Sequence, residues 1–224
     1  MTAALTSPTD WYIARGTGLV ALVLFSTAVA LGVVGVRRWR STRWPRLVTA
    51  GLHRSIALLA VCFLVVHIVT AELDRWIGLG WLDVVVPFRS PYRPLWVGLG
   101  TVAFDLALAI TATSLLRRHL GHRLWRAVHW TAWLLWPVAL LHGLAAGSDT
   151  RSGWGLVVVL ACIGLVAAAA AWRFAGTWVD RARQARASAP AHVDRHTEPT
   201  VRAVPTDPAV PARQLVGSTP RRSA

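Results

Sequence analysis

The sequence predicts an all-α membrane protein, a bundle of five transmembrane helices, and three observations support this fold class. Hydrophobic residues make up 54% of the 224 residues and charged residues only 15%, which lies outside the range of soluble domains. Apolar segments recur with the length of roughly 17 to 25 residues that a helix needs to cross a hydrocarbon core. Arginine-rich loops also alternate with loops that have no excess of positive charge.

The predicted membrane helices account for most of residues 11–175. They cover residues 12–36, 47–71, 95–116, 125–146 and 154–174. A sixth apolar stretch, 76–88, is shorter, contains glycine and is interrupted by Asp83. We therefore expect a re-entrant or interfacial segment on the outer surface there, and no additional span.

The arginines predict the orientation, because short cytoplasmic loops hold the excess of positive charge. All 24 basic residues are arginine, and among the loops between spans the first and third hold the most, five and, with Arg126 counted, four. The N-terminus is then outside and the C-terminus inside, in a multi-pass protein of the inner (plasma) membrane. The first apolar run is too long for a cleaved signal peptide, so we expect a retained first span.

The charged end of the sequence predicts no folded domain. Residues 180–224 are rich in proline, alanine and arginine and lack apolar periodicity, which is typical of a disordered cytoplasmic tail. The net charge of +14 raises the question of nucleic acid, but no nucleic-acid-binding motif accompanies it. The charge is better explained by the need to keep the arginine-rich loops and tail on the cytoplasmic side, with the lipid bilayer as the partner.

Four histidines lie inside predicted spans, His53 and His67 on the second and His129 and His142 on the fourth. Both helices run from inside to outside. Spacings of 14 and 13 residues correspond to about 21 and 19.5 Å along a helix, so His53 is level with His129, and His67 with His142. Facing imidazoles at one depth suit a bis-histidine b-type haem, and ligation satisfies nitrogens that hydrocarbon would leave unpaired. Two haem b groups stacked across the membrane are predicted.

The rotation of the fourth helix does not fit this pairing directly. At about 100° per residue, His142 points about 140° away from His129 on a straight helix. Pro137 lies between them, and proline kinks a helix by removing a hydrogen bond. We therefore expect the phase of this helix to be reset at Pro137.

Four arginines are candidates to pair with haem propionates, because a guanidinium binds a carboxylate in bidentate fashion. Arg54 and Arg126 lie beside the inner histidines, and Arg15 and Arg93 lie near the outer ends of the first and third spans. Snorkelling or membrane orientation explains any one of them equally well.

The histidine segments resemble a known family. "HRSIALLAVCFLVVH" and "HWTAWLLWPVALLH" are similar to the two-haem core of the ferric reductase-like transmembrane domain. Ferric reductases, NADPH oxidases and the haem subunit of a bacterial methionine sulfoxide reductase system share this domain. The resemblance covers residues 11–175, including "WYIARGTGLVALVL" and "SPYRPLWVGLG". It implies transmembrane electron transfer, with His53 and His129 on the inner haem and His67 and His142 on the outer.

The sequence departs from the larger members of that family after residue 175. No strand followed by GxGxxG is predicted there, so we expect no flavin- or nicotinamide-binding module. The chain is then an oxidoreductase component. Its electrons are expected to come from a separate cytoplasmic flavoprotein reductase or from membrane quinol, and to leave to an extracytoplasmic acceptor.

A second class of function stays open on the sequence alone. In a haem-free membrane scaffold or transporter subunit, the histidines would bind a metal ion, couple protons or bond to neighbouring helices. Against this, ligands about 20 Å apart cannot share one ion. Thiolate and carboxylate co-ligands are also missing at the two levels. Covalent haem is not expected, because the sequence has no CxxCH motif.

Overall fold

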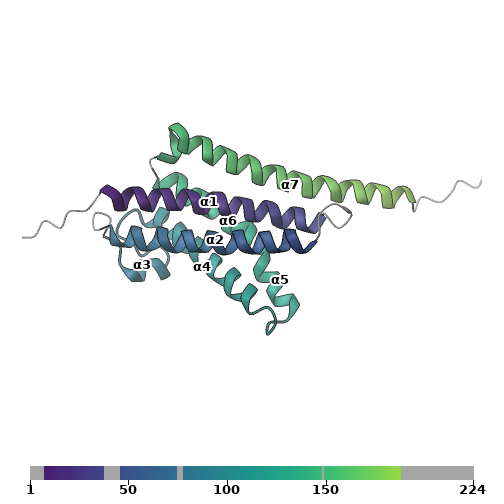
Figure 1. The fold of residues 1–224 in the computed structure, drawn as a ribbon, viewed down its shortest axis with the longest axis horizontal. Helices are drawn as coiled ribbons and strands as arrows, with labels where there is room; N and C mark the ends of the chain where they lie inside the picture. Colours follow the sequence, from purple (N-terminus) through teal and green to yellow (C-terminus); the bar gives the residue numbers. More distant parts are fainter. Residues whose placement is uncertain (1–7, 38–45, 75–77, 148, 188–224) are drawn as a thin grey trace, which may run out of the picture. The chain divides into compact units, whose positions relative to one another are not determined.

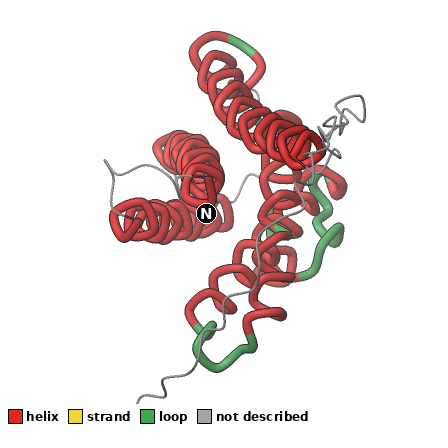
Figure 2. Tube along the Cα trace, turned by 90° about the vertical axis from the view of Figure 1, so that its right-hand side faces the viewer, coloured by secondary structure: helices red, strands yellow, loops and turns green. Residues whose placement is uncertain are grey.

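The computed structural model describes residues 8–37, 46–74, 78–147 and 149–187, and these residues form helices with no strand (Figures 1 and 2). The chain divides into two compact units, Met1–Arg183 and Gln184–Ala224. The first unit contains all the candidate residues named above.

Four helices are long and apolar enough to cross a membrane. They are α1 (Pro8–Arg37), α2 (Arg46–Leu73), α4 (Pro94–Leu115) and α7 (Gly153–Ala187). They correspond to the predicted first, second, third and fifth spans. The protein is therefore a multi-pass membrane protein, and its described residues are all-helical apart from turns and loops.

Helix α7 continues beyond its predicted end and into the predicted tail. The first eight residues of the segment 180–224 are helical, and residues 188–224 lie outside the described residues. These eight residues are "DRARQARA", in which alanine, arginine and glutamine are good helix formers. An existing helix adds such residues without a new nucleation step.

The predicted fourth span is divided into α5 (His122–Trp130) and α6 (Ala132–Ala146), which meet at Thr131. The hydroxyl and the backbone N–H of Thr131 both donate to the carbonyl of Val128, at 2.7 and 3.0 Å. This i to i−3 bond tightens the turn and changes the helical phase. The break in the helix was predicted at Pro137, but α6 runs through Pro137 and the break lies six residues earlier, at Thr131.

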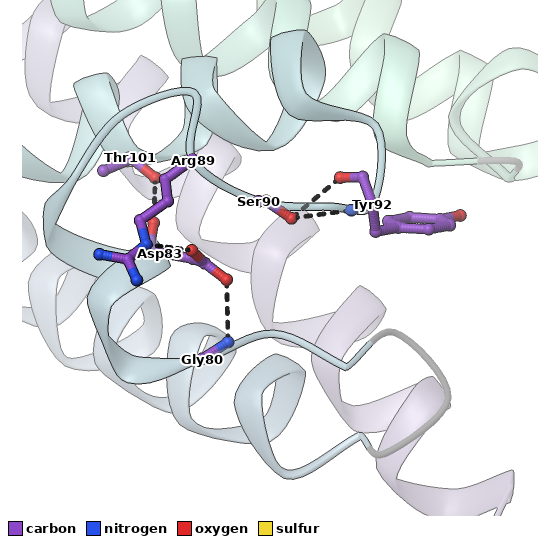
Figure 3. Close-up of polar contacts among 6 residues, drawn as sticks. All are labelled: Gly80, Asp83, Arg89, Ser90, Tyr92 and Thr101. Carbon is purple, nitrogen blue, oxygen red and sulfur yellow. Dashed lines mark hydrogen bonds and ion pairs between the residues drawn. The ribbon is translucent and has the colours of Figure 1, made fainter.

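The stretch predicted to be re-entrant or interfacial contains only a short helix, α3 (Trp81–Val85), followed by a turn; residues 75–77 lie outside the described residues. The carboxylate of Asp83 is buried and accepts the N–H of Gly80 at 3.0 Å (Figure 3). The hydroxyl of Thr101 on α4 donates to the carbonyl of Asp83 at 2.8 Å. The first bond holds the segment's own turn, and the second fastens the segment to α4.

The first unit is built from two pairs of packed helices. Helix α2 lies along α1, and α6 lies along α4, while α1 also contacts α6 (Figure 1). A core around Leu22, Val159 and Cys162 joins α1 to α7, with side chains of α6 packed against it. The short 3-10 helix η2 (Asp149–Arg151) leads from α6 to α7.

Two polar side chains inside this apolar bundle, Trp136 and Ser26, are joined by a hydrogen bond between helices. The indole N–H of Trp136 on α6 donates to the hydroxyl of Ser26 on α1 at 2.8 Å. Ser26 in turn donates to the carbonyl of Leu22 at 2.7 Å. This chain of bonds links α1 and α6 where no water would be present.

Candidate metal centres

The structure brings the four span histidines together as two pairs. The ring centres of His53 and His129 are 6.1 Å apart, and those of His67 and His142 are 6.2 Å apart. The ring planes make an angle of 74° in both pairs. These are the pairs that the residue spacing predicts, and they require α2 to run parallel to α5 and α6.

Three of the four imidazoles are anchored in the same way, by a backbone carbonyl of a neighbouring helix. A carbonyl oxygen only accepts, so Nδ1 carries the proton in each case and Nε2 keeps its lone pair. Metal-binding histidines almost always donate their second nitrogen in this manner. The distances from Nδ1 to oxygen are 2.9 Å for His53 and Ala28, 2.6 Å for His67 and Ala14, and 2.7 Å for His142 and Trp96.

His129 is held differently. Its buried Nδ1 has no hydrogen-bond partner among the described residues. Instead, its ring stacks on Trp125 one turn earlier in α5, with ring centres 5.2 Å apart and planes 24° apart. The indole N–H of Trp125 is 3.4 Å from the hydroxyl of Ser114 on α4. The inner pair therefore has one carbonyl anchor, and the outer pair has two.

The spacing of the rings suits one metal ion between the members of each pair. With a metal–imidazole bond of about 2.0 Å, as for zinc, and about 1.1 Å from nitrogen to ring centre, two opposed imidazoles have centres about 6.2 Å apart. In the described part of the chain, no three His, Cys, Asp or Glu side chains gather in one place. Each pair thus offers two imidazole ligands, the set that would hold the iron of a bis-histidine haem.

Comparison with protein families identifies the chain. A model of the family described as the ferric reductase like transmembrane component matches residues 17–140, more than half of the 224 residues. The chain belongs to this family. The match includes His53, His67 and His129 and ends two residues before His142. Searches of curated proteins and of solved structures found no match.

In this ferric reductase-like chain, two of the candidate arginines lie at the level of the outer histidines. Arg93 precedes α4 with φ 44°, and its Nη1 donates to the carbonyl of Ala145 at 3.0 Å, three residues beyond His142. Arg15 follows Ala14, the anchor of His67, and its guanidinium lies 4.0 Å from the centre of the Trp11 ring. Arg93 thus contacts the end of α6, the helix that carries His142. Arg15 contacts the beginning of α1, the helix that anchors His67.

The other two candidate arginines lie at the inner level and are exposed. Arg54 is adjacent to His53, and Arg126 is three residues before His129. Exposure leaves both guanidinium groups accessible to an anionic group at this level.

Two features of the site were not predicted from the sequence. One is the ring stacking of Trp125, for which the signal was its i, i+4 spacing from His129. The other is the set of carbonyl anchors. Its signal was a 14-residue spacing between Gly18 and Gly32 in the first span, equal to the spacing of the two histidines in the second.

Proposed function

We propose that this ferric reductase-like protein carries electrons across the membrane through two bis-histidine b-type haems. The single observation that supports this most is the pair of matched imidazole couples, with centres 6.1 and 6.2 Å apart and Nδ1 engaged elsewhere in three rings of four. When bound, haem supplies the one-electron chemistry of its iron. Membership of the ferric reductase-like family supports a redox role.

The chain's own residues hold and orient the two groups in this proposal. His53 and His129 bind the inner iron, and His67 and His142 the outer. The carbonyl anchors fix the tautomer, so that Nε2 faces the metal. Arg54 and Arg126 would pair with haem propionates at the inner level, and Arg15 and Arg93 at the outer level.

The layer between the two levels is apolar. Ala103, Ala107 and Leu135 form a buried core there, and Phe25 and Leu64 pack against it. All five side chains are apolar and come from α1, α2, α4 and α6. An apolar layer of this kind keeps the two centres apart from solvent and screens charges at the two levels less than water would.

We further propose five membrane crossings, with α5 and α6 together forming the fourth. The N-terminus is then outside and the C-terminus inside, in the inner (plasma) membrane. The arginine-rich loops support this orientation. Residues 122–146 give the divided segment a length sufficient for a crossing.

The donor in this proposal is a separate cytoplasmic flavoprotein reductase or membrane quinol, and the acceptor is extracytoplasmic. The described residues contain no strand, and a flavin- or nicotinamide-binding βαβ unit requires strands. Reduction of purified protein by a quinol analogue alone would favour quinol over a flavoprotein.

The deciding experiment measures haem in protein purified from cells with an ample haem supply. We expect a b-type reduced-minus-oxidised spectrum and about two haems per chain. His67→Ala or His142→Ala should remove one haem, and His53→Ala or His129→Ala the other. His119→Ala, at an exposed position after α4, is the matched control and should retain both.

A colourless wild-type protein would contradict the proposal. If that protein bound zinc or copper instead, the alternative of a haem-free membrane scaffold or transporter subunit, with metal- or proton-coupled histidines, would be favoured.

A further inference from the structure

Each carbonyl that anchors an imidazole lies four residues before a glycine on the same helix. Ala14 precedes Gly18 and Ala28 precedes Gly32 on α1, and Trp96 precedes Gly100 on α4. The same glycines face the anchored rings. A Cβ atom at Gly18 would lie 2.9 Å from Nδ1 of His67, and one at Gly100 would lie 2.7 Å from Cε1 of His142.

The geometry of the α-helix explains why glycine stands at these places. The carbonyl of residue i−4 already accepts the N–H of residue i, so the imidazole must use the second lone pair of the oxygen. The Cα–Cβ bond of residue i tilts toward the helix N-terminus and thus toward that carbonyl. A Cβ atom at residue i therefore points toward a ring that approaches this carbonyl, and the distance between helix and ring decides whether a side chain fits.

The outer and inner pairs differ in this respect. Both outer rings lie so close to their glycines that a methyl group would not fit. At the inner level, a Cβ atom at Gly32 would lie 3.5 Å from Cε1 of His53, which is an ordinary van der Waals distance. His129 has no such glycine contact among the described residues and is held by Trp125 instead.

We infer that Gly18 and Gly100 are positioning residues for the outer imidazole pair, His67 and His142. Because neither glycine has a side chain, Nδ1 of His67 can reach the carbonyl of Ala14, and Nδ1 of His142 can reach the carbonyl of Trp96. These two bonds fix the directions of the opposite ring nitrogens, Nε2, which would bind the metal. In the inner pair, no glycine and no carbonyl anchor among the described residues faces His129, so the position of its ring is less constrained. The inference rests on the proposed function where it identifies the bound group as haem. Its statement about the hydrogen bonds of His67 and His142 does not depend on that function.

The test compares alanine substitutions at facing and non-facing glycines. Gly18→Ala and Gly100→Ala should displace an outer imidazole and lower the haem content from about two to about one per chain. The haem lost should be the one that His67→Ala removes, identified by its ferric low-spin EPR signal and its component in a potentiometric titration. The inner haem that remains reports that the chain is folded.

Matched controls come from α1, which carries Gly18, and from α6, which carries His142. A Cβ atom at Gly16, two residues from Gly18, or at Gly143, next to His142, would meet nothing within 4 Å. Gly16→Ala and Gly143→Ala should retain both haems and both EPR signals, as should Gly32→Ala. Unchanged haem content and spectra in Gly18→Ala and Gly100→Ala would overturn the inference, and so would loss of both haems in these two variants.

Nitrogen NMR of haem-free protein separates this inference from the proposed function. With ¹⁵N-labelled histidine, we expect Nδ1 to carry the proton in His53, His67 and His142, and Gly18→Ala to change the signals of His67 alone. Unchanged His67 signals in Gly18→Ala would overturn the inference whatever the haem content. Expected tautomers in a wild-type protein that never binds haem would support the positioning role and contradict the haem proposal.

Discussion

Individual polar residues of this chain are satisfied in two ways, and the difference determines which of them form a site. Serine and threonine hydroxyls in the helices bond to carbonyls of their own preceding turn, as Ser26 does with Leu22 and Thr113 with Ala109. The anchored histidines bond to carbonyls of another helix. A hydroxyl is therefore paired wherever its helix lies, whereas an imidazole nitrogen is paired only after the helices have packed.

Asp83 offers a test of a buried polar contact at this scale. Its carboxylate is 8% exposed and accepts the N–H of Gly80, so Asp83→Ala leaves that donor unpaired and should destabilise residues 78–90 by about 1–3 kcal/mol. Asp83→Asn retains an acceptor and should lose less. Hydrogen–deuterium exchange of this segment in lipid nanodiscs measures the difference.

Arg89 is the control for this prediction. Its Nε lies 3.8 Å from the carboxylate of Asp83 and its side chain is 55% exposed, so Arg89→Ala should cost only about 0–1 kcal/mol (Figure 3). Equal exchange rates in Asp83→Ala and Arg89→Ala would show that the ion pair, and not the backbone bond, stabilises the segment.

At the scale of the element, the junction of α5 and α6 directs two ligands toward α2. His129 lies in α5 and His142 in α6, and the tightened turn at Thr131 separates them. A straight helix would point the two rings about 140° apart. The turn at Thr131 thus changes the helical phase between the two histidines, the role that the sequence predicted for Pro137.

Replacement of Pro137 tests this assignment. Because α6 already runs through Pro137, Pro137→Ala should keep both histidine pairs and about two haems per chain. Pyridine haemochrome analysis of the purified variant measures the content. Selective loss of the haem bound by His142 would show that the proline, and not the turn at Thr131, sets the phase. Gly143→Ala, at a position with free space, serves as the control.

For the whole molecule, the parallel course of α2 and α6 is the property on which the site depends. If α2 ran opposite to α6, the two histidines of α2 could not pair with partners at the same levels. Two membrane helices run parallel when an odd number of crossings separates them in the chain. The orientation predicted from the arginine-rich loops requires the same.

Cysteine labelling tests the proposed orientation. In a background with Cys62 and Cys162 replaced by alanine, Ser152→Cys lies at an exposed position between α6 and α7, and His119→Cys at an exposed position after α4. A membrane-impermeant maleimide should label position 152 in intact cells and position 119 only after permeabilisation. The reverse pattern would invert the direction of electron transfer in the proposal.

Much of the site follows from the sequence because it depends on distances along single helices. The rise per residue and the thickness of a bilayer are the same for every helix, so spacings of 14 and 13 residues were enough to assign His53, His67, His129 and His142 to two levels. The family was also recognisable from these segments, and the match over residues 17–140 confirms it.

Only the tertiary structure decided how the rings are held. Which nitrogen of His67 is free, why Gly18 faces it, and why His129 stacks on Trp125 all depend on how each helix is rotated about its axis and how closely it approaches its neighbour. Lateral packing and a single tightened turn at Thr131 set those rotations, and neither leaves a periodic signal in the chain. The sequence by itself predicted the level of each of the four histidines along its helix, and packing determined the direction of its ring.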